Sequence, residues 1–159
     1  ETGRCRGLLL YRADTPVACI NYGPARTKNL NAGTDSSFPN DNYRDWGEII
    51  SFYTHPDERG KGYGGAVLGE IKRKNEGRRV ILNIETLDEE CDNREERVRR
   101  KNFYLKNGFN EAGYKTRENN VVYEMLYYGG IVSEEEYSAL IEKYLGKFFF
   151  KFYYKKIGK

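Results

Sequence analysis

The 159-residue sequence has little cysteine and almost no histidine, and both shortages exclude common kinds of site. Its three cysteines, Cys5, Cys19 and Cys91, are odd in number and widely spaced, which makes a poor disulfide framework and a poor zinc site. We therefore expect free thiols in a reducing compartment. His55 is the only histidine, and no partners for a metal site or a catalytic triad accompany it, so we expect an exposed loop residue and no metal.

The sequence also lacks long apolar runs and a large excess of one charge. No basic segment followed by an apolar one opens it, and no apolar run approaches membrane-spanning length, so we expect a cytoplasmic protein without a membrane partner. Its 27 basic and 24 acidic side chains give a net charge of +3, which is too balanced for a dedicated nucleic-acid binder. We expect no nucleic-acid partner.

Strand and helix patterns alternate along the chain. The segment 8–22 reads as a hairpin around the turn-forming residues 13–16, whereas 23–47 carries no clear period and is expected to be functional or mobile. Further strands are predicted at 48–54, 79–87, 121–128 and 148–154, and helices at 66–75, 93–107 and from Ser133 onward. We expect one α/β or α+β domain over 1–159 with a central sheet, in which 129–159 forms a C-terminal helix-plus-strand extension.

A glycine-rich loop between a strand and a helix is the most informative feature of the chain. Gly60–Gly65 hold four glycines in six positions, preceded by Arg59, and Lys61 lies within the loop. Glycines let the backbone turn tightly and approach a ligand, and a helix N-terminus offers unpaired N–H groups with a partial positive charge. The loop is therefore suited to a pyrophosphate. The patterns of the Walker loop and of the Rossmann dinucleotide fold are not met.

The residues Arg59, Gly62 and Gly64 form the pattern Arg-x-x-Gly-x-Gly, which resembles the signature of the GNAT superfamily of N-acetyltransferases. The resemblance implies a mostly antiparallel, mixed central sheet with a splayed parallel strand pair and flanking helices. It also implies that the loop binds the pyrophosphate of acetyl-CoA through backbone N–H groups. The cofactor-binding residues of the loop would be Arg59, Gly60, Lys61, Gly62, Tyr63, Gly64 and Gly65.

A second stretch is similar to another hallmark of the family, a helix that ends in Tyr-x-x-x-Gly-Phe. Here the pattern begins at Tyr104 and ends at Gly108-Phe109. The resemblance implies that Tyr104 lies near the sulfur of the coenzyme and protonates the departing thiolate, a role that suits an O–H donor. The alternative is a helix tyrosine that only packs against the sheet.

The resemblance also implies a general base, because a protonated amine cannot attack a thioester. Glu48 stands eleven residues before Arg59, the spacing of the base in histone-acetylating members. A half-buried carboxylate could take the amine proton through a water. A strand-edge glutamate that faces solvent is the alternative, and Glu85 on the next predicted strand is the reserve base.

In the family, two parallel strands splay apart and the coenzyme arm pairs with one of them. The pair here would be 48–54 and 79–87, so that backbone groups at Phe52, Tyr53 and Thr54 would pair with pantetheine and polarise the thioester carbonyl. Asn93 is a further candidate for seating the coenzyme, although its spacing to Tyr104 exceeds the common family pattern.

Three segments leave alternatives open. The family usually has a strand and one or two helices before the hairpin, and these elements border the acceptor site. Either the segment 23–47 and the C-terminal segment replace them here, or the chain is shortened. The basic run Arg97–Lys101 could meet nucleic acid or the coenzyme 3′-phosphate, but a solvated helix face is the expectation. The aromatic run Phe148–Tyr154 must be covered, by sheet completion first, a homodimer interface second, or an apolar acceptor third.

The main hypothesis is direct transfer of an acetyl group from acetyl-CoA to a primary amine of an unidentified acceptor. One rival is a module that binds CoA without turnover, and another is a protein- or RNA-interaction domain that uses the basic, aromatic C-terminus. Release of free thiol with an amine distinguishes the hypothesis from the first rival.

Overall fold

The structure is a computed structural model that describes residues 6–24, 46–88, 91–118 and 120–157. Cys5 and most of the loop expected at 23–47 lie outside the described residues. The chain divides into two compact units, Glu1–Val80 and Ile81–Lys159, and each is described by itself. The prediction of a single domain over 1–159 stays a prediction.

In the described residues of the first unit there are three strands, a short 3-10 helix and one α-helix. They are β1 (Arg6–Arg12), β2 (Thr15–Pro24), β3 (Trp46–Thr54), η2 (Pro56–Glu58) and α1 (Tyr63–Lys74). The second unit contains β4 (Arg79–Glu85), whose first residues precede the boundary, then α2 (Arg94–Lys106), β5 (Asn110–Glu118), β6 (Val121–Tyr128), α3 (Glu134–Tyr153) and β7 (Tyr154–Ile157).

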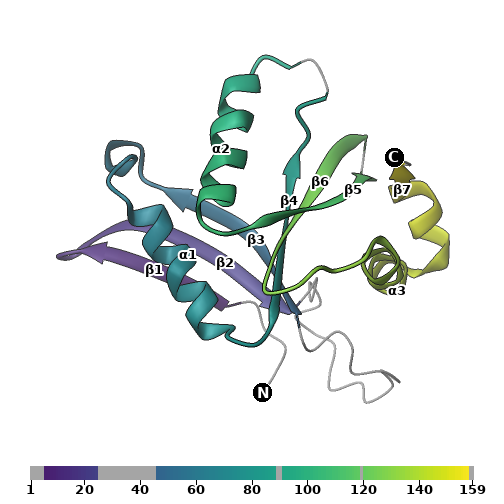
Figure 1. Ribbon diagram of the computed structural model, residues 1–159, viewed down its shortest axis with the longest axis horizontal. Coiled ribbons are helices and arrows are strands. Elements are labelled where there is room, and N and C mark those ends of the chain that lie inside the picture. The colour runs from purple at the N-terminus through teal and green to yellow at the C-terminus, as the bar shows by residue number, and fades with distance from the viewer. Residues whose placement is uncertain (1–5, 25–45, 89–90, 119, 158–159) are drawn as a thin grey trace. The chain divides into compact units, whose positions relative to one another are not determined.

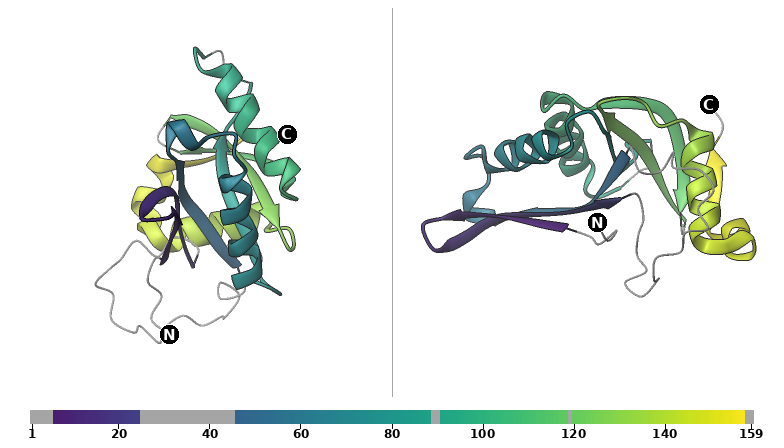
Figure 2. Two further views of the ribbon diagram at one scale, coloured as in Figure 1. Left: turned by 90° about the vertical axis from the view of Figure 1, so that its left-hand side faces the viewer. Right: turned by 90° about the horizontal axis from the view of Figure 1, so that it is seen from below.

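The hairpin predicted at 8–22 is confirmed as β1 and β2, which pair antiparallel. β3 pairs antiparallel with β2, with Ile20 opposite Phe52. α1 packs against these three strands and covers one face of the hairpin (Figure 2). It does so because Val67, Leu68 and Ile71 recur at helical spacing and are buried, so one stripe of the helix is apolar.

β3 ends at Thr54, one residue before His55-Pro56, as the sequence predicts. Pro56 cannot donate a ladder hydrogen bond and instead begins the 3-10 helix η2. The backbone N–H of His55 still bonds to the carbonyl of Val17 at 2.9 Å, which fixes the exit of the chain from the strand. The glycine loop therefore starts from a firmly held position.

In the second unit the strands follow the order β4-β6-β5-β7 (Figure 1). β5 is antiparallel to β6 and to β7. The core of the unit comes from β4, β6 and α3, whose buried side chains include Ile81, Leu82, Ile84, Met125, Leu126, Tyr137 and Ile141. The strand predicted at 121–128 is confirmed as β6.

Both predicted helix termini of this unit are confirmed in detail. The hydroxyl of Ser133 accepts from the N–H of Glu136 at 3.2 Å, and the Glu136 carboxylate accepts from the N–H of Ser133 at 2.9 Å, which is a capping box. After the C-terminus of α2, Gly108 adopts a left-handed φ of 83°. These signals are local, so the sequence alone can specify them.

The strand expected at Phe148–Tyr154 is wrong. Residues 148–153 are helical and belong to α3, which is kinked at Gly146 with φ 74° and ψ 154°, and a strand begins only at Tyr154. The aromatic composition of the run favours a strand, but the helix resumes after the glycine. A helix followed by a short strand is present at 134–157, and its role as a C-terminal extension of the domain stays a prediction.

The fold is a mixed α/β arrangement with antiparallel strand pairs and flanking helices, as predicted. The expected splay of the strands at 48–54 and 79–87 concerns both units and stays a prediction. Among the helices of the described residues, none has the length and apolar character needed to cross a membrane.

Candidate acetyl-CoA site

The glycine loop of the first unit leads directly into the N-terminus of α1. Gly62 is the N-cap of the helix and has a left-handed φ of 86°, while Gly60 has a φ of 77°. Side chains with a Cβ rarely adopt these values, so glycine is required here by the backbone. A Cβ at Gly62 would have no heavy atom within 4 Å, so the space beside the turn is open.

The first turn of α1 leaves its backbone donors available to a ligand. The first amide of the helix with a backbone acceptor is that of Ala66, which bonds to the Gly62 carbonyl at 3.1 Å. Among the described residues, the amides of Tyr63, Gly64 and Gly65, which precede Ala66, have no hydrogen-bond acceptor, and no side chain caps this end of the helix. The first turn also carries no acidic residue, and the last turn carries Lys72, Arg73 and Lys74. An anion is therefore favoured at this terminus by both the dipole and the free donors.

Two basic residues predicted at the rim of the loop are already partly engaged. Arg59 is exposed, and its Nε donates to the carbonyl of Thr54 at 3.4 Å. Lys61 Nζ lies 3.1 Å from Oε2 of Glu58, the residue that ends η2. An ammonium has three donors, so Lys61 can hold Glu58 and still meet a phosphate.

Glu58 is a residue of this region that sequence reasoning missed. Its side chain is only 8% exposed, and its second oxygen lies 2.8 Å from Nη2 of Arg12 in β1. A buried carboxylate needs paired charges, and Arg12 and Lys61 supply them. The contact joins the end of the hairpin to the loop. No local signal reveals it, because Arg12 and Glu58 are far apart in the sequence.

The other predicted cofactor contacts of the first unit lie on β3. Phe52, Tyr53 and Thr54 pair through their backbones with Ile20, Cys19 and Ala18 of β2. Their pairing with pantetheine stays a prediction. Glu48 also lies in β3, with its backbone opposite Gly23. The side chain of Glu48 lies outside what the structure describes, so its role as base stays a prediction.

In the second unit, Tyr104 occupies the C-terminal turns of α2 and is 6% exposed. Its ring makes edge-to-face contacts with Phe103 and Phe109, with ring centroids 5.3 Å and 5.8 Å apart. Burial raises the pKa of the Tyr104 hydroxyl, and the nearby Arg100 opposes that effect only in part. The hydroxyl is therefore protonated at neutral pH, as a proton donor must be.

The pattern Tyr-x-x-x-Gly-Phe has a structural reason of its own. The N–H of Phe109 bonds to the Tyr104 carbonyl at 3.1 Å, and the N–H of Gly108 bonds to the Leu105 carbonyl at 3.0 Å. Together with the left-handed Gly108 these bonds form a Schellman motif, which commonly includes an apolar contact like that of Phe109 with Tyr104. Tyr104 therefore does pack as a structural residue, and this packing is compatible with a catalytic role for its hydroxyl.

The remaining candidates of this unit, Glu85 and Asn93, contact arginines of α2. Oε2 of Glu85 lies 3.4 Å from Nε of Arg97 and 3.2 Å from Nη1 of Arg100. Asn93 is the N-cap of α2, and its Oδ1 accepts from Nε of Arg97 at 2.9 Å. In this structure Glu85 and Asn93 position the helix. Their roles as reserve base and cofactor contact stay predictions.

The prediction that Arg97–Lys101 form a solvated helix face is wrong for two of these residues. The Arg97 side chain is 11% exposed and also donates to the Thr86 carbonyl at 3.0 Å. Lys101 is 17% exposed and lies 2.8 Å from Glu124 and 3.0 Å from Glu111. These basic groups meet carboxylates and carbonyls of their own unit, which leaves them less available to an external phosphate.

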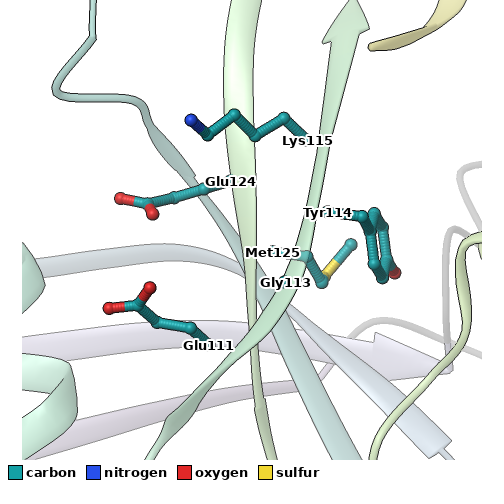
Figure 3. A pocket seen from close by; sticks show the side chains of 6 residues that line it. All are labelled: Glu111, Gly113, Tyr114, Lys115, Glu124 and Met125. Carbon is teal, nitrogen blue, oxygen red and sulfur yellow. The ribbon is translucent and has the colours of Figure 1, made fainter. Parts of the chain in front are cut away.

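A small cleft of about 120 Å³ lies over β5 and β6. It is lined by Glu111, Gly113, Tyr114, Lys115, Glu124 and Met125 (Figure 3). In Figure 3 the carboxylates of Glu111 and Glu124 point to the same side of the strands, where Lys101 binds both. Both carboxylates that line the cleft are thus paired with a lysine of α2, and we assign the cleft no cofactor.

A sequence model of the family described as "Acetyltransferase (GNAT) domain" matches residues 6–111, which include the glycine loop and Tyr104. The chain belongs to the GNAT acetyltransferase family. The curated protein "Putative acetyltransferase YjbC" of Bacillus subtilis (strain 168) is 34% identical over 92 residues, which are 53% of this chain and 45% of that protein. The chain therefore aligns with about half the length of this relative.

Solved structures of GNAT enzymes share the fold. A protein from Bacteroides thetaiotaomicron assigned to the GNAT family superposes with a TM-score of 0.58 at 21% identity, over 89% of this chain and 70% of its own. An aminoglycoside 6′-N-acetyltransferase in complex with coenzyme A gives a TM-score of 0.53 at 13% identity, over 77% and 71% of the two chains. At these identities the likeness concerns the fold alone.

Proposed function

We propose that this protein transfers an acetyl group from acetyl-CoA to a primary amine. The observation that carries the proposal is the N-terminus of α1. Its N-cap, Gly62, is left-handed, and the amides of Tyr63, Gly64 and Gly65 precede the first backbone-bonded amide. Membership of the GNAT family supports acetyl-CoA as the source of the acetyl group.

The loop binds the pyrophosphate through these amides, and Lys61 and Arg59 add charge at its rim. Backbone groups at Phe52, Tyr53 and Thr54 hold the pantetheine arm and polarise the thioester carbonyl. This arrangement fixes the carbonyl carbon for attack, so the enzyme contributes mainly by orientation and by electrostatic stabilisation.

The reaction proceeds by direct attack. The neutral amine nitrogen forms a bond to the carbonyl carbon, and the bond between that carbon and sulfur breaks as the thiolate leaves. Tyr104, whose hydroxyl is protonated at neutral pH, gives its proton to the thiolate as the carbon–sulfur bond breaks. The proton lost by the amine goes to Glu48, directly or through a water, with Glu85 as the reserve acceptor.

Calorimetry with acetyl-CoA tests the binding step. The wild-type protein is expected to bind, and Gly62→Glu is expected not to, because it strains the turn and sets a carboxylate where the phosphates belong. Gly69→Glu is the matched control, since Gly69 lies in the same helix with open space around a Cβ. No heat with the wild-type protein, or equal binding by Gly62→Glu, would remove the proposal.

Thiol release with a panel of amines tests turnover. The panel should include small amines, aminoglycosides, peptides with free N-termini and peptides with internal lysine. The proposal predicts amine-dependent release of CoA with at least one class. Binding of acetyl-CoA without release for any of them would identify a CoA-binding module instead.

A further inference from the structure

The C-terminal part of α3 carries three exposed phenylalanines. Phe148, Phe149 and Phe152 are 70%, 64% and 73% exposed. We call them the Phe face. The N-terminal part of the same helix is conventional, since it buries Tyr137 and Ile141 in the core of its unit. The kink at Gly146 separates the two parts and redirects the helix.

The Phe face is held in place by its neighbours. Phe150 is half-buried and stacks on Tyr154 with ring centroids 5.0 Å apart and an interplanar angle of 19°. Tyr154 is itself 4% exposed and begins β7, which pairs with β5. The helix is therefore anchored on both sides of residue 152, and the exposure of the Phe face is a property of an ordered element.

The three rings form one apolar projection. The centroid of Phe148 lies 5.5 Å from that of Phe149 and 5.3 Å from that of Phe152. The edge-to-face contact of Phe148 with Phe149 occupies a ring face that a stacked nucleic-acid base would need. The geometry favours insertion of the cluster into an apolar medium over stacking on single-stranded bases.

The charged residues of the segment that carries the Phe face have one sign. Residues 143–159 contain six lysines and no aspartate or glutamate. Lys147 and Lys151 are exposed and lie on the same short helix as the phenylalanines. Such a surface attracts an anionic partner. It would repel a second copy of itself, because a two-fold contact through the Phe face would bring two sets of lysines together.

Apolar aromatic residues next to lysines on a helix are the composition of segments that lie at the boundary between lipid headgroups and acyl chains. We propose that the Phe face and its lysines dock this protein on an anionic lipid surface. The phenylalanines enter the acyl boundary, and Lys147 and Lys151 contact the anionic headgroups. Docking of this kind needs neither a membrane-spanning segment nor a signal sequence, so it differs from the expectation of no membrane partner.

Sedimentation with lipid vesicles tests the proposal. Vesicles of phosphatidylcholine with phosphatidylglycerol should bind the protein about tenfold or more better than vesicles of phosphatidylcholine alone, and added salt should weaken the binding. The variant Phe148→Ser/Phe149→Ser/Phe152→Ser should lose about tenfold or more in binding. Circular dichroism checks that it folds, which the exposure of all three side chains predicts.

Two further variants sharpen the result. Lys147→Glu/Lys151→Glu should reduce binding to the anionic vesicles and leave the apolar rings intact. Leu9→Ser/Tyr11→Ser removes exposed apolar side chains from β1 in the other unit and should bind as the wild-type protein does. Equal loss in this control would mean that exposed apolar area in general drives the binding, and would overturn the proposal.

Other partners give distinct outcomes. Absence of binding to anionic vesicles overturns the proposal. So does a dimer in light scattering that the triple phenylalanine variant dissociates in the absence of lipid, because the occupant is then a second copy. Binding of labelled single-stranded RNA that the same variant abolishes, without vesicle binding, would also overturn it.

Discussion

Lys61 Nζ lies 3.1 Å from a carboxylate oxygen of Glu58, so the glycine loop is tied to a buried anion. Arg12 holds the other oxygen at 2.8 Å. Both basic side chains are about half exposed, whereas that of Glu58 is 8% exposed. The free-energy cost of desolvation therefore falls mainly on the carboxylate. The loop thus gains a fixed position from the pair, and Lys61 keeps donors for a ligand.

The asymmetry of burial predicts an asymmetric response to mutation. Arg12→Ala/Lys61→Ala leaves a buried carboxylate without its two cations, and we expect a loss of about 2–4 kcal/mol in the free energy of unfolding. Glu58→Gln removes the buried charge and leaves two largely solvated cations, so its loss should be about 1 kcal/mol or less. Urea unfolding measures both. A larger loss for Glu58→Gln would contradict this account of the pair.

The backbone of Gly62 predicts that even a methyl group is unfavourable there. Gly62→Ala should lose about 1 kcal/mol of stability because alanine resists a φ of 86°. Gly69→Ala in the same helix should gain about 0.5–1 kcal/mol, since its backbone is helical and alanine is the better helix former. Urea unfolding distinguishes the two signs. A stabilising Gly62→Ala would mean that the left-handed turn is not maintained in solution.

Tyr104 should matter to turnover more than to binding. Tyr104→Phe keeps the Schellman motif and its aromatic contacts but removes the proton donor, so kcat should fall about a hundredfold while the affinity for acetyl-CoA stays within about twofold. Steady-state kinetics and calorimetry separate the two. Unchanged kcat would assign Tyr104 to packing alone.

Burial of two tyrosines predicts a loss of stability at high pH. The pKa of Tyr104 and the pKa of Tyr114 both lie above the ordinary value of 10.0, mainly through burial. Above about pH 10 the unfolded chain ionises these hydroxyls while the folded chain keeps them protonated. Ionisation lowers the free energy of the unfolded state, so the free energy of unfolding falls as pH rises. At lower pH both states are protonated and the contribution is constant.

Substitution by phenylalanine tests this dependence. Tyr104→Phe/Tyr114→Phe should unfold in urea with a shallower decline in stability above about pH 10 than the wild-type protein. The two proteins should show parallel pH profiles below that range. An equal decline above pH 10 would show that other groups control the alkaline transition.

A chain of hydrogen bonds joins three elements of the second unit. Asn83 in β4 donates to the hydroxyl of Tyr137 in α3 at 2.6 Å, and that hydroxyl donates to Glu118 in β5 at 2.8 Å. Tyr137→Phe should lower the free energy of unfolding by about 1–3 kcal/mol, because Asn83 and Glu118 each lose this hydrogen-bond partner. Thermal unfolding measures the loss, and Tyr127→Phe is the control, because Tyr127 is a half-buried residue of β6. A neutral Tyr137→Phe would mean that solvent replaces the hydroxyl.

The sequence predicts most strongly those features that depend on neighbouring residues. Gly62 and Gly108 occupy the left-handed positions that their motifs require, and the Ser133–Glu136 capping box follows from spacing alone. The long-range contact of Arg12 with Glu58 carries no such local signal.

The sequence pattern does not predict two elements correctly, and each failure has a physical reason. The run at 148–153 is rich in aromatic residues, yet it is helical and leaves three of them in solvent. β5 (Asn110–Glu118) is strongly charged and lacks a regular alternation, because the pairing shifts between Glu111 and Lys115, with Gly113 at a φ of 80°. Some of its charged side chains form ion pairs that only the fold brings together, such as Glu111 with Lys101.

The binding of a diphosphate by the first turn of α1 is tested most directly by the amide resonances of that turn. Titration of ¹⁵N-labelled protein with CoA should shift the amides of Tyr63, Gly64 and Gly65, and pantetheine, which lacks the diphosphate, should leave them largely unmoved. If CoA binds while these three resonances stay in place, the pyrophosphate lies elsewhere and the proposed acetyl-CoA site is wrong.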